Sequence, residues 1–465
     1  MTSAPGRSDP LFGPPLREAG SRPAKGRLWS ALAVATVMGV LIGRFLLAGG
    51  GVDPGSPAPR TSATGQARVA ELQRRLGATP DDSALLAQLG IAYLGRTRET
   101  ADPSFYTKAD QALQRSQSLD GANPLTMTGL GLLAQARHDF TGALEWARQV
   151  QVIDPGSREA LGIIVDALVE LGRYDEAAAS AQEMVDRRPS LASLARVSLL
   201  RELNGDVADA ITAMTQAAIA GGGGPAADVA FVETVVGDLE FGQGRLARAE
   251  AAYRRAAELQ PGLGFAEVGL ARVAAARDDL DGGVAQLAAV VTRLPFPAWV
   301  AWLGDMEQAA GRTREAAERF ELVRQIQALD EANGVDGSLE AARFEADHAR
   351  GPQGRADAAV DGARAARERR PTIFADDTLG WALRQAGRAE EALPYARAAV
   401  RLGTADAVLW YHLAATEADL GMLEEARGHL DKALSINPYL TVRDRPDALA
   451  LAARLGASVP APRER

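Results

Sequence analysis

Residues 172–177 read GRYDEA, a turn containing glycine followed by the start of a helix that carries a small alanine. The same succession of a turn, an alanine and then apolar or small residues at helical spacing returns along most of the chain. The alanine, replaced once by glycine, falls at Ala109, Ala143, Ala177, Ala210, Ala249, Gly283, Ala316, Ala359, Ala392 and Ala426. Most of these positions are 33 or 34 residues apart, and the two long steps are 39 and 43. A period of this size predicts a repeat array.

Each period predicts a pair of helices. Between residues 161 and 168 apolar side chains recur at helical spacing, Gly172 interrupts them, and the spacing resumes from 174 to 184. A proline ends many of the second helices, at Pro155, Pro189, Pro261, Pro295, Pro371 and Pro438. One such hairpin cannot bury its apolar face alone, so we expect neighbouring hairpins to stack and share one long core.

The repeats resemble those of the tetratricopeptide repeat (TPR) family. Its motif residues are present in the fifth unit as Gly237, Ala249, Tyr253, Ala256 and Pro261, in the tenth as Trp410, Leu413, Ala426, Leu430, Ala433 and Pro438, and in the first as Leu89, Gly90, Tyr93 and Ala109. The resemblance covers residues 81–440. It implies an all-α fold, an α-solenoid of about ten TPR-like helical hairpins, in a bacterial membrane-anchored TPR protein.

The chain before the repeats divides into three predicted segments. Residues 1–27 are rich in Pro, Gly and Ser with five basic and two acidic side chains, which is typical of a disordered basic tail. Residues 28–48 are mostly apolar and carry no charge except on Arg44, and 21 helical residues span about 31 Å, enough for a bilayer core of about 30 Å. Residues 49–64 form a Gly/Pro/Ser-rich linker.

We interpret residues 28–48 as a transmembrane signal anchor. A cleaved signal peptide and a buried globular helix are the alternatives. The excess of basic residues before the segment predicts a cytoplasmic N-terminus and a single pass through the cell membrane, with the repeat array outside the cytoplasm.

Helices outside the repeats are expected to cap the two ends of the array. Residues 65–80 predict an N-terminal capping helix with Val69, Leu72 and Leu76 on one face, and residues 441–465 a C-terminal capping helix and tail. Within the first repeat, residues 95–107 predict an unusually long loop between the helices. The 43-residue step near residues 330–355 makes the eighth repeat the least regular.

The composition gives little support to catalysis. The chain has no cysteine, which excludes a thiolate nucleophile, a disulfide framework and a thiolate metal site. Its four histidines do not form a His-Glu-x-x-His motif, and no serine lies in a Gly-x-Ser-x-Gly turn. We therefore expect no enzyme activity, no cofactor and no bound metal.

The resemblance also implies a binding face, because certain first-helix positions of TPR hairpins line a concave surface. Aromatic and Arg side chains are favoured at interface centres. The candidate partner-binding residues are Phe231, Asp238, Phe241, Phe265, Arg272, Asp305, Phe374, Asp377, Trp381, Arg384 and Tyr411. An alternative is that these rings fill the core between repeats.

The charge balance disfavours nucleic acid as a partner. Residues 61–465 hold 44 basic and 57 acidic side chains, a net charge of −13, and Asp166, Asp238 and Asp305 share one predicted concave position. An acidic groove would repel phosphates and favour a basic or neutral partner. A solvated acidic surface would show the same count.

These observations predict a non-catalytic, membrane-anchored scaffold that binds a protein or peptide on its concave face. The alternative comes from residues 65–93, which are similar to the TPR segment of bacterial cytochrome c maturation subunits. That similarity implies a subunit that holds an apoprotein substrate for haem attachment.

Overall fold

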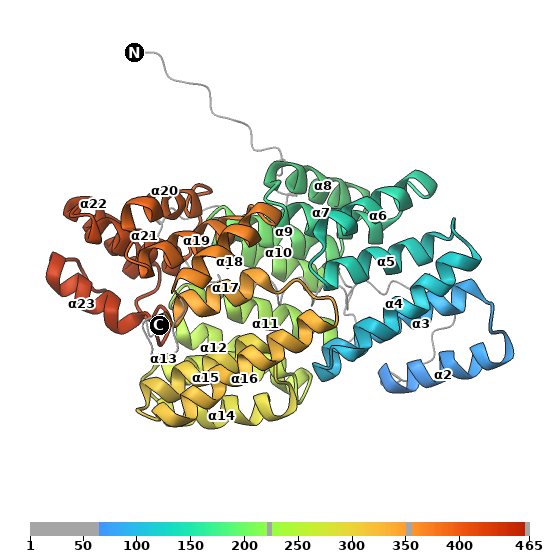
Figure 1. Cartoon of the computed structure of the whole chain (residues 1–465), viewed down its shortest axis with the longest axis horizontal. Helices are drawn as coiled ribbons and strands as arrows, with labels where there is room; N and C mark the ends of the chain where they lie inside the picture. The colour runs from blue at the N-terminus through green and yellow to red at the C-terminus, as the bar shows by residue number, and fades with distance from the viewer. Residues whose placement is uncertain (1–64, 221–225, 350–355, 461–465) are drawn as a thin grey trace, which may run out of the picture.

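The computed structural model describes residues 65–220, 226–349 and 356–460, and these residues form 22 helices and no strand (Figure 1). The first eleven are α2 (Gly65–Ala78), α3 (Ser83–Thr100), α4 (Ser104–Leu119), α5 (Pro124–Ala136), α6 (Phe140–Ile153), α7 (Arg158–Glu170), α8 (Tyr174–Arg187), α9 (Leu191–Leu203), α10 (Val207–Ala220), α11 (Ala226–Gly242) and α12 (Leu246–Leu259). The others are α13 (Gly264–Ala276), α14 (Leu280–Arg293), α15 (Pro297–Ala309), α16 (Thr313–Ala332), α17 (Ser338–Asp347), α18 (Ala356–Arg369), α19 (Ile373–Gln385), α20 (Ala389–Ala399), α21 (Ala407–Asp419), α22 (Leu423–Ile436) and α23 (Arg445–Leu455).

The predicted tail, transmembrane anchor and linker at 1–27, 28–48 and 49–64 lie outside the described residues. None of the helices in the described ranges combines the length and the apolar composition needed to cross a bilayer.

The helices pair into ten hairpins, from α3/α4 to α21/α22, with α2 beside the first and α23 beside the last. Within each hairpin the two helices pack closely, and from α4 to α15 each second helix also packs on the next first helix. The prediction of an all-α solenoid of about ten hairpins is therefore confirmed.

Small side chains allow this close packing. The recurrent alanine of the second helix is fully buried in most hairpins, for example at Ala143, Ala177 and Ala249. Several first helices begin with a side-chain cap, such as Asn123 before α5, Ser157 before α7 and Asp406 before α21, which satisfies backbone N–H groups that have no partner within the helix.

The first and eighth repeats differ in length from the others. The predicted long loop at residues 95–107 is wrong: α3 continues to Thr100 and α4 begins at Ser104, so the additional residues lengthen helices. Near the 43-residue step, α16 extends over 20 residues, whereas α17 has only 10.

The solenoid turns back on itself, so that its C-terminal hairpins lie against turns of its N-terminal hairpins (Figure 1). The Asp336 amide donates to the Arg137 carbonyl (2.9 Å), and the Ile373 amide donates to the Tyr174 hydroxyl (3.0 Å). Further along, Asn437 Nδ2 donates to the Phe241 carbonyl (3.2 Å), and Arg445 pairs with Asp278 (2.8 Å).

We call these contacts the seam, and include in it the close approaches of Gly172 to Pro371 and of Gly205 to Gly403. Tyr174 and Ile373 are 199 residues apart, about six times the 34-residue period. One superhelical turn therefore takes about six hairpins, and successive turns touch.

Candidate partner-binding face

The inner face is defined here as the surface of the first helices that carries the eleven candidate residues. None of the eleven is exposed. Asp238, Phe241, Phe374, Asp377, Trp381 and Tyr411 are buried, and Phe231, Phe265, Arg272, Asp305 and Arg384 are partly buried. The structure thus packs these side chains against neighbouring parts of the chain, whereas the sequence predicts an open concave groove.

Four aspartates of the inner face each lie next to a cationic or ionisable group on the first helix of the following hairpin. Asp166 on α7 accepts two hydrogen bonds from Arg196 on α9, at 2.8 and 2.6 Å. The other pairs are Asp238 with Arg272 (3.7 Å), Asp305 with His348 (2.9 Å) and Asp377 with His412 (2.9 Å).

These four inner-face pairs change the expected electrostatics. Asp166, Asp238 and Asp305 were expected to make the groove acidic, but each has a nitrogen partner within 4 Å. Burial opposes the charged form of His348, yet the hydrogen bond and the charge of Asp305 outweigh it and raise the His348 pKa. The carboxylates therefore link successive repeats.

Aromatic candidates of the middle repeats contact other side chains of the chain. Phe265 meets Trp299 edge-to-face, with ring centroids 4.8 Å apart, and so joins the core of repeats 6 and 7. Arg272 lies over both the Phe241 ring (4.2 Å) and the Trp302 ring (4.8 Å). These contacts match the alternative that the rings fill the space between repeats.

One cluster of rings and polar groups of the inner face lies on α19 and α21. Trp381 stacks on His412 with centroids 3.7 Å apart and planes 10° from parallel, and Arg384 lies 4.9 Å from the Trp381 ring while pairing with Asp419. Within the described residues, Trp381 Nε1, Thr378 Oγ1 and His412 Nε2 are buried and have no hydrogen-bond partner. Such groups retain unused capacity to bind polar atoms.

Two buried carboxylates meet near this cluster from opposite sides of the seam. Glu202 lies on α9, and Asp406 caps α21 by accepting the amides of Val408 and Leu409. Burial, aided by the nearby carboxylates of Asp238 and Asp406, raises the pKa of Glu202 well above its ordinary value. Burial likewise raises the pKa of Asp406 to about 6, although Arg343 opposes the shift.

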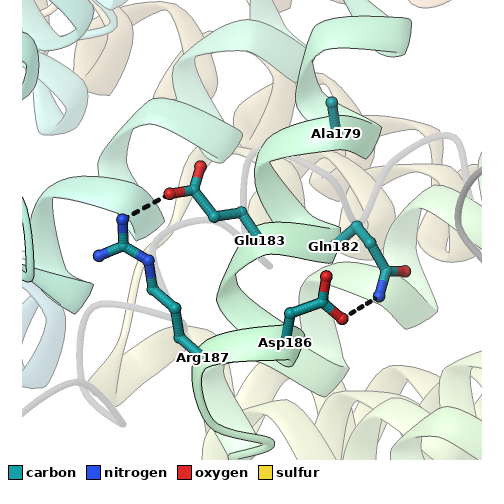
Figure 2. Close-up of a pocket in the computed structure, with 5 residues that line it drawn as sticks. All are labelled: Ala179, Gln182, Glu183, Asp186 and Arg187. Carbon is teal, nitrogen blue, oxygen red and sulfur yellow. Dashed lines mark hydrogen bonds and ion pairs between the residues drawn. The ribbon is translucent and has the colours of Figure 1, made fainter.

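A hollow on the outer surface of α8 was not foreseen from the sequence. Figure 2 shows its lining, Ala179, Gln182, Glu183, Asp186 and Arg187. Arg187 pairs with Glu183 (2.5 Å), and Gln182 donates to Asp186 (2.7 Å). Because its polar groups already pair with one another, we assign it no ligand. In the described ranges, no three His, Asp or Glu side chains are placed to hold a metal ion.

The nitrogen-bearing partners Arg196, His348 and His412 were missed as members of the inner face. Arg196 lies 30 residues after Asp166, His348 lies 43 after Asp305, and His412 lies 35 after Asp377. These separations are about one repeat, and the longest spans the 43-residue step. That spacing was the available signal.

Comparison with known families agrees with the geometry. Residues 128–192, 164–226, 204–264 and 378–441 match the tetratricopeptide repeat family. The chain is similar to TPR repeats over these ranges, which cover less than half of its residues. The matched ranges include α7 to α12 and most of the last two hairpins, and TPR repeats are protein-interaction modules that are typically non-catalytic.

Solved structures with a similar fold share little sequence with this chain. The human IFIT1 dimer with m7Gppp-AAAA is 13% identical with a TM-score of 0.43, covering 73% of this chain and 77% of that one. Yeast Tom70 is 13% identical with a TM-score of 0.35, covering 80% and 95%. The APC/C hetero-tetramer Cut9–Hcn1 is 13% identical with a TM-score of 0.33, covering 84% and 93%. These values carry no functional argument, and no curated protein matches the sequence.

Proposed function

We propose that this chain is a non-catalytic TPR scaffold that binds a protein or peptide partner through its inner face. The observation that carries the proposal is the cluster around Trp381 and His412. It combines aromatic rings, an arginine and buried polar atoms with unused hydrogen-bonding capacity. Aromatic and Arg side chains of this kind dominate the energetics of protein interfaces.

The proposal includes a membrane anchor at residues 28–48, with the repeats outside the cytoplasm. It is supported by the apolar run and by the basic residues before it. Protease added to spheroplasts with a sealed cytoplasmic membrane should cut within residues 65–460. Protection of that range until the cells are lysed would contradict the orientation.

The test of partner binding is capture by the full chain, read by mass spectrometry and compared between two variants. Trp381→Phe keeps a ring but removes the indole N–H, so we expect weaker capture by a chain that still folds, with a melting temperature lowered by the cavity that the smaller ring leaves. Val152→Ser alters an exposed outer side chain and is the matched control. Loss of the partner in the control, with retention in Trp381→Phe, would move the binding site to the outer surface.

The same experiment addresses the apocytochrome alternative. Its sequence basis lies in residues 65–93, which form α2 and part of α3. Captured apocytochrome peptides would favour a cytochrome c maturation role over a general scaffold.

A further inference from the structure

We propose that the seam opens about a hinge between α16 and α17, and that opening admits the protein partner to the inner face. This inference rests on the proposed function, because it states how a partner reaches a face that the chain itself covers. Opening involves the joint between α16 and α17, the contacts across the seam, and the charges that oppose closure.

The joint between α16 and α17 differs from the other connections of the array. The backbones of these two helices do not approach as closely as those of other successive helices among the described hairpins. Their contact runs through side chains, with the Phe320 and Phe344 rings edge-to-face at 5.9 Å and an Arg324–Glu345 pair at 2.6 Å. A connection of this kind can bend without separating packed helices.

Contacts across the seam are made by turns and side-chain tips. In the described part of the chain, helices that pack closely along their length are neighbours or next neighbours in sequence. Across the seam the main polar links are the Ile373 and Asp336 amides, Asn437, and the buried pair of Arg370 with Glu170 (2.6 Å). Apolar contacts also cross the seam: buried residues of α9, α10 and α11 share one core with residues of α17, α18, α19 and α21. Ile373, Phe374 and Leu409 join the core of α5 to α10. Opening therefore separates these polar links and the apolar core that crosses the seam, while the packing within each hairpin is kept.

Like charges meet across this seam. Asp406 on the C-terminal side is surrounded by Glu202 of α9, Asp377 of α19 and the cation Arg343 of α17, and Glu202 also faces Asp238 of α11. Glu202 Oε1 and Asp406 Oδ2 have no hydrogen-bond partner among the described residues. Ionisation of these carboxylates is better tolerated in water, so it favours the open form.

Hydrogen exchange in the full chain tests the opening directly, because the Ile373 and Asp336 amides bond to acceptors on the other side of the seam. We expect both to exchange faster than amides in the middle of α7. Gly205→Ala should accelerate them about tenfold, because its Cβ would lie 2.7 Å from the Gly403 carbonyl oxygen. Gly421→Ala is the matched control: Gly421 has a similar positive φ, yet its Cβ would meet no described atom within 4 Å.

A second variant keeps the inference testable if Gly205→Ala does not fold. Asp406→Asn keeps a capping oxygen and removes one of the facing charges, so it should slow exchange of the Ile373 and Asp336 amides at pH 8. Exchange of these amides only at the rate of the α7 core would overturn the inference, as would equal effects of Gly205→Ala and Gly421→Ala.

The two proposals fail in different ways. If the seam amides behave as expected but the full chain captures no specific partner, the scaffold function is wrong. If a partner is captured but the seam amides exchange only with global unfolding, the seam is a fixed part of the fold, and the partner uses another face.

Discussion

At the scale of single residues, the inner-face pairs are expected to be worth more than ion pairs on the surface. Asp166 and Arg196 are both buried and share two hydrogen bonds. Asp166→Ala would leave the Arg196 charge buried and uncompensated, so we expect a loss of about 3–5 kcal/mol in the free energy of unfolding. Thermal unfolding followed by circular dichroism measures the effect.

The control for this variant is the exposed Arg173–Glu176 pair. Glu176→Ala should leave the melting temperature unchanged, because solvent-exposed pairs contribute little. Similar losses in the two variants would show that the inner face is more solvated than the structure indicates.

Asp406 gives the residue-scale prediction for pH. Its folded-state pKa of about 6 lies above the ordinary value of 3.8. Its contribution to stability is therefore complete below about pH 4 and is lost as the pH rises through 6. Asp406→Asn cannot ionise, and asparagine also caps helices well. At pH 8 it should be more stable than the wild type by up to about 3 kcal/mol.

Unfolding of the Asp406→Asn variant should be compared with the wild type at pH 4 and pH 8. We expect nearly equal stability at pH 4 and a clear difference at pH 8. If the variant and the wild type differed in stability by the same amount at pH 4 and at pH 8, Asp406 would not be buried beside other carboxylates.

At the scale of elements, substitutions at two glycine turns distinguish the stability lost through unfavourable backbone geometry from the stability lost through steric overlap at the seam. Gly172 and Gly387 occupy equivalent turns with φ of +67° and +74°, but a Cβ at Gly172 would collide with the Pro371 carbonyl, whereas one at Gly387 would meet no described atom within 4 Å. Gly387→Ala should cost about 1–2 kcal/mol for the left-handed conformation. Gly172→Ala should cost a further 1–3 kcal/mol or so from overpacking.

Chemical denaturation of these two variants checks the difference. Equal losses would mean that the turn of repeat 3 does not touch the C-terminal hairpins. The comparison needs no knowledge of the partner.

The elements themselves were largely predictable from the sequence, whereas their burial was not. The recurrent alanines located the second helices because a hairpin of small side chains needs one at the same place in every repeat. Arg196 and His412, the partners of Asp166 and Asp377, were not recognised, because helical periodicity describes one helix at a time. The Trp381 ring is covered by His412 and Arg384, and the Phe241 ring by Arg272 and by the core that it shares with Tyr439.

At the scale of the whole molecule, the decisive feature is closure of the superhelix. Contacts between residues about 199 positions apart, such as Tyr174 and Ile373, depend on the small rotation that each hairpin adds to the last. No pattern within one repeat specifies the total rotation over several hairpins, so the seam could not be predicted from the repeats. It determines which side chains a partner can reach.

Closure can be measured directly because the chain has no cysteine of its own. Thr107 Oγ1 and Asn333 Oδ1 lie 3.1 Å apart although they are 226 residues apart in sequence. The double variant Thr107→Cys with Asn333→Cys, oxidised in dilute solution, should form an intramolecular disulfide, seen as a mobility shift on a non-reducing gel that the single variants lack. Two thiols that remain free and reactive in a folded monomer would contradict the closed superhelix.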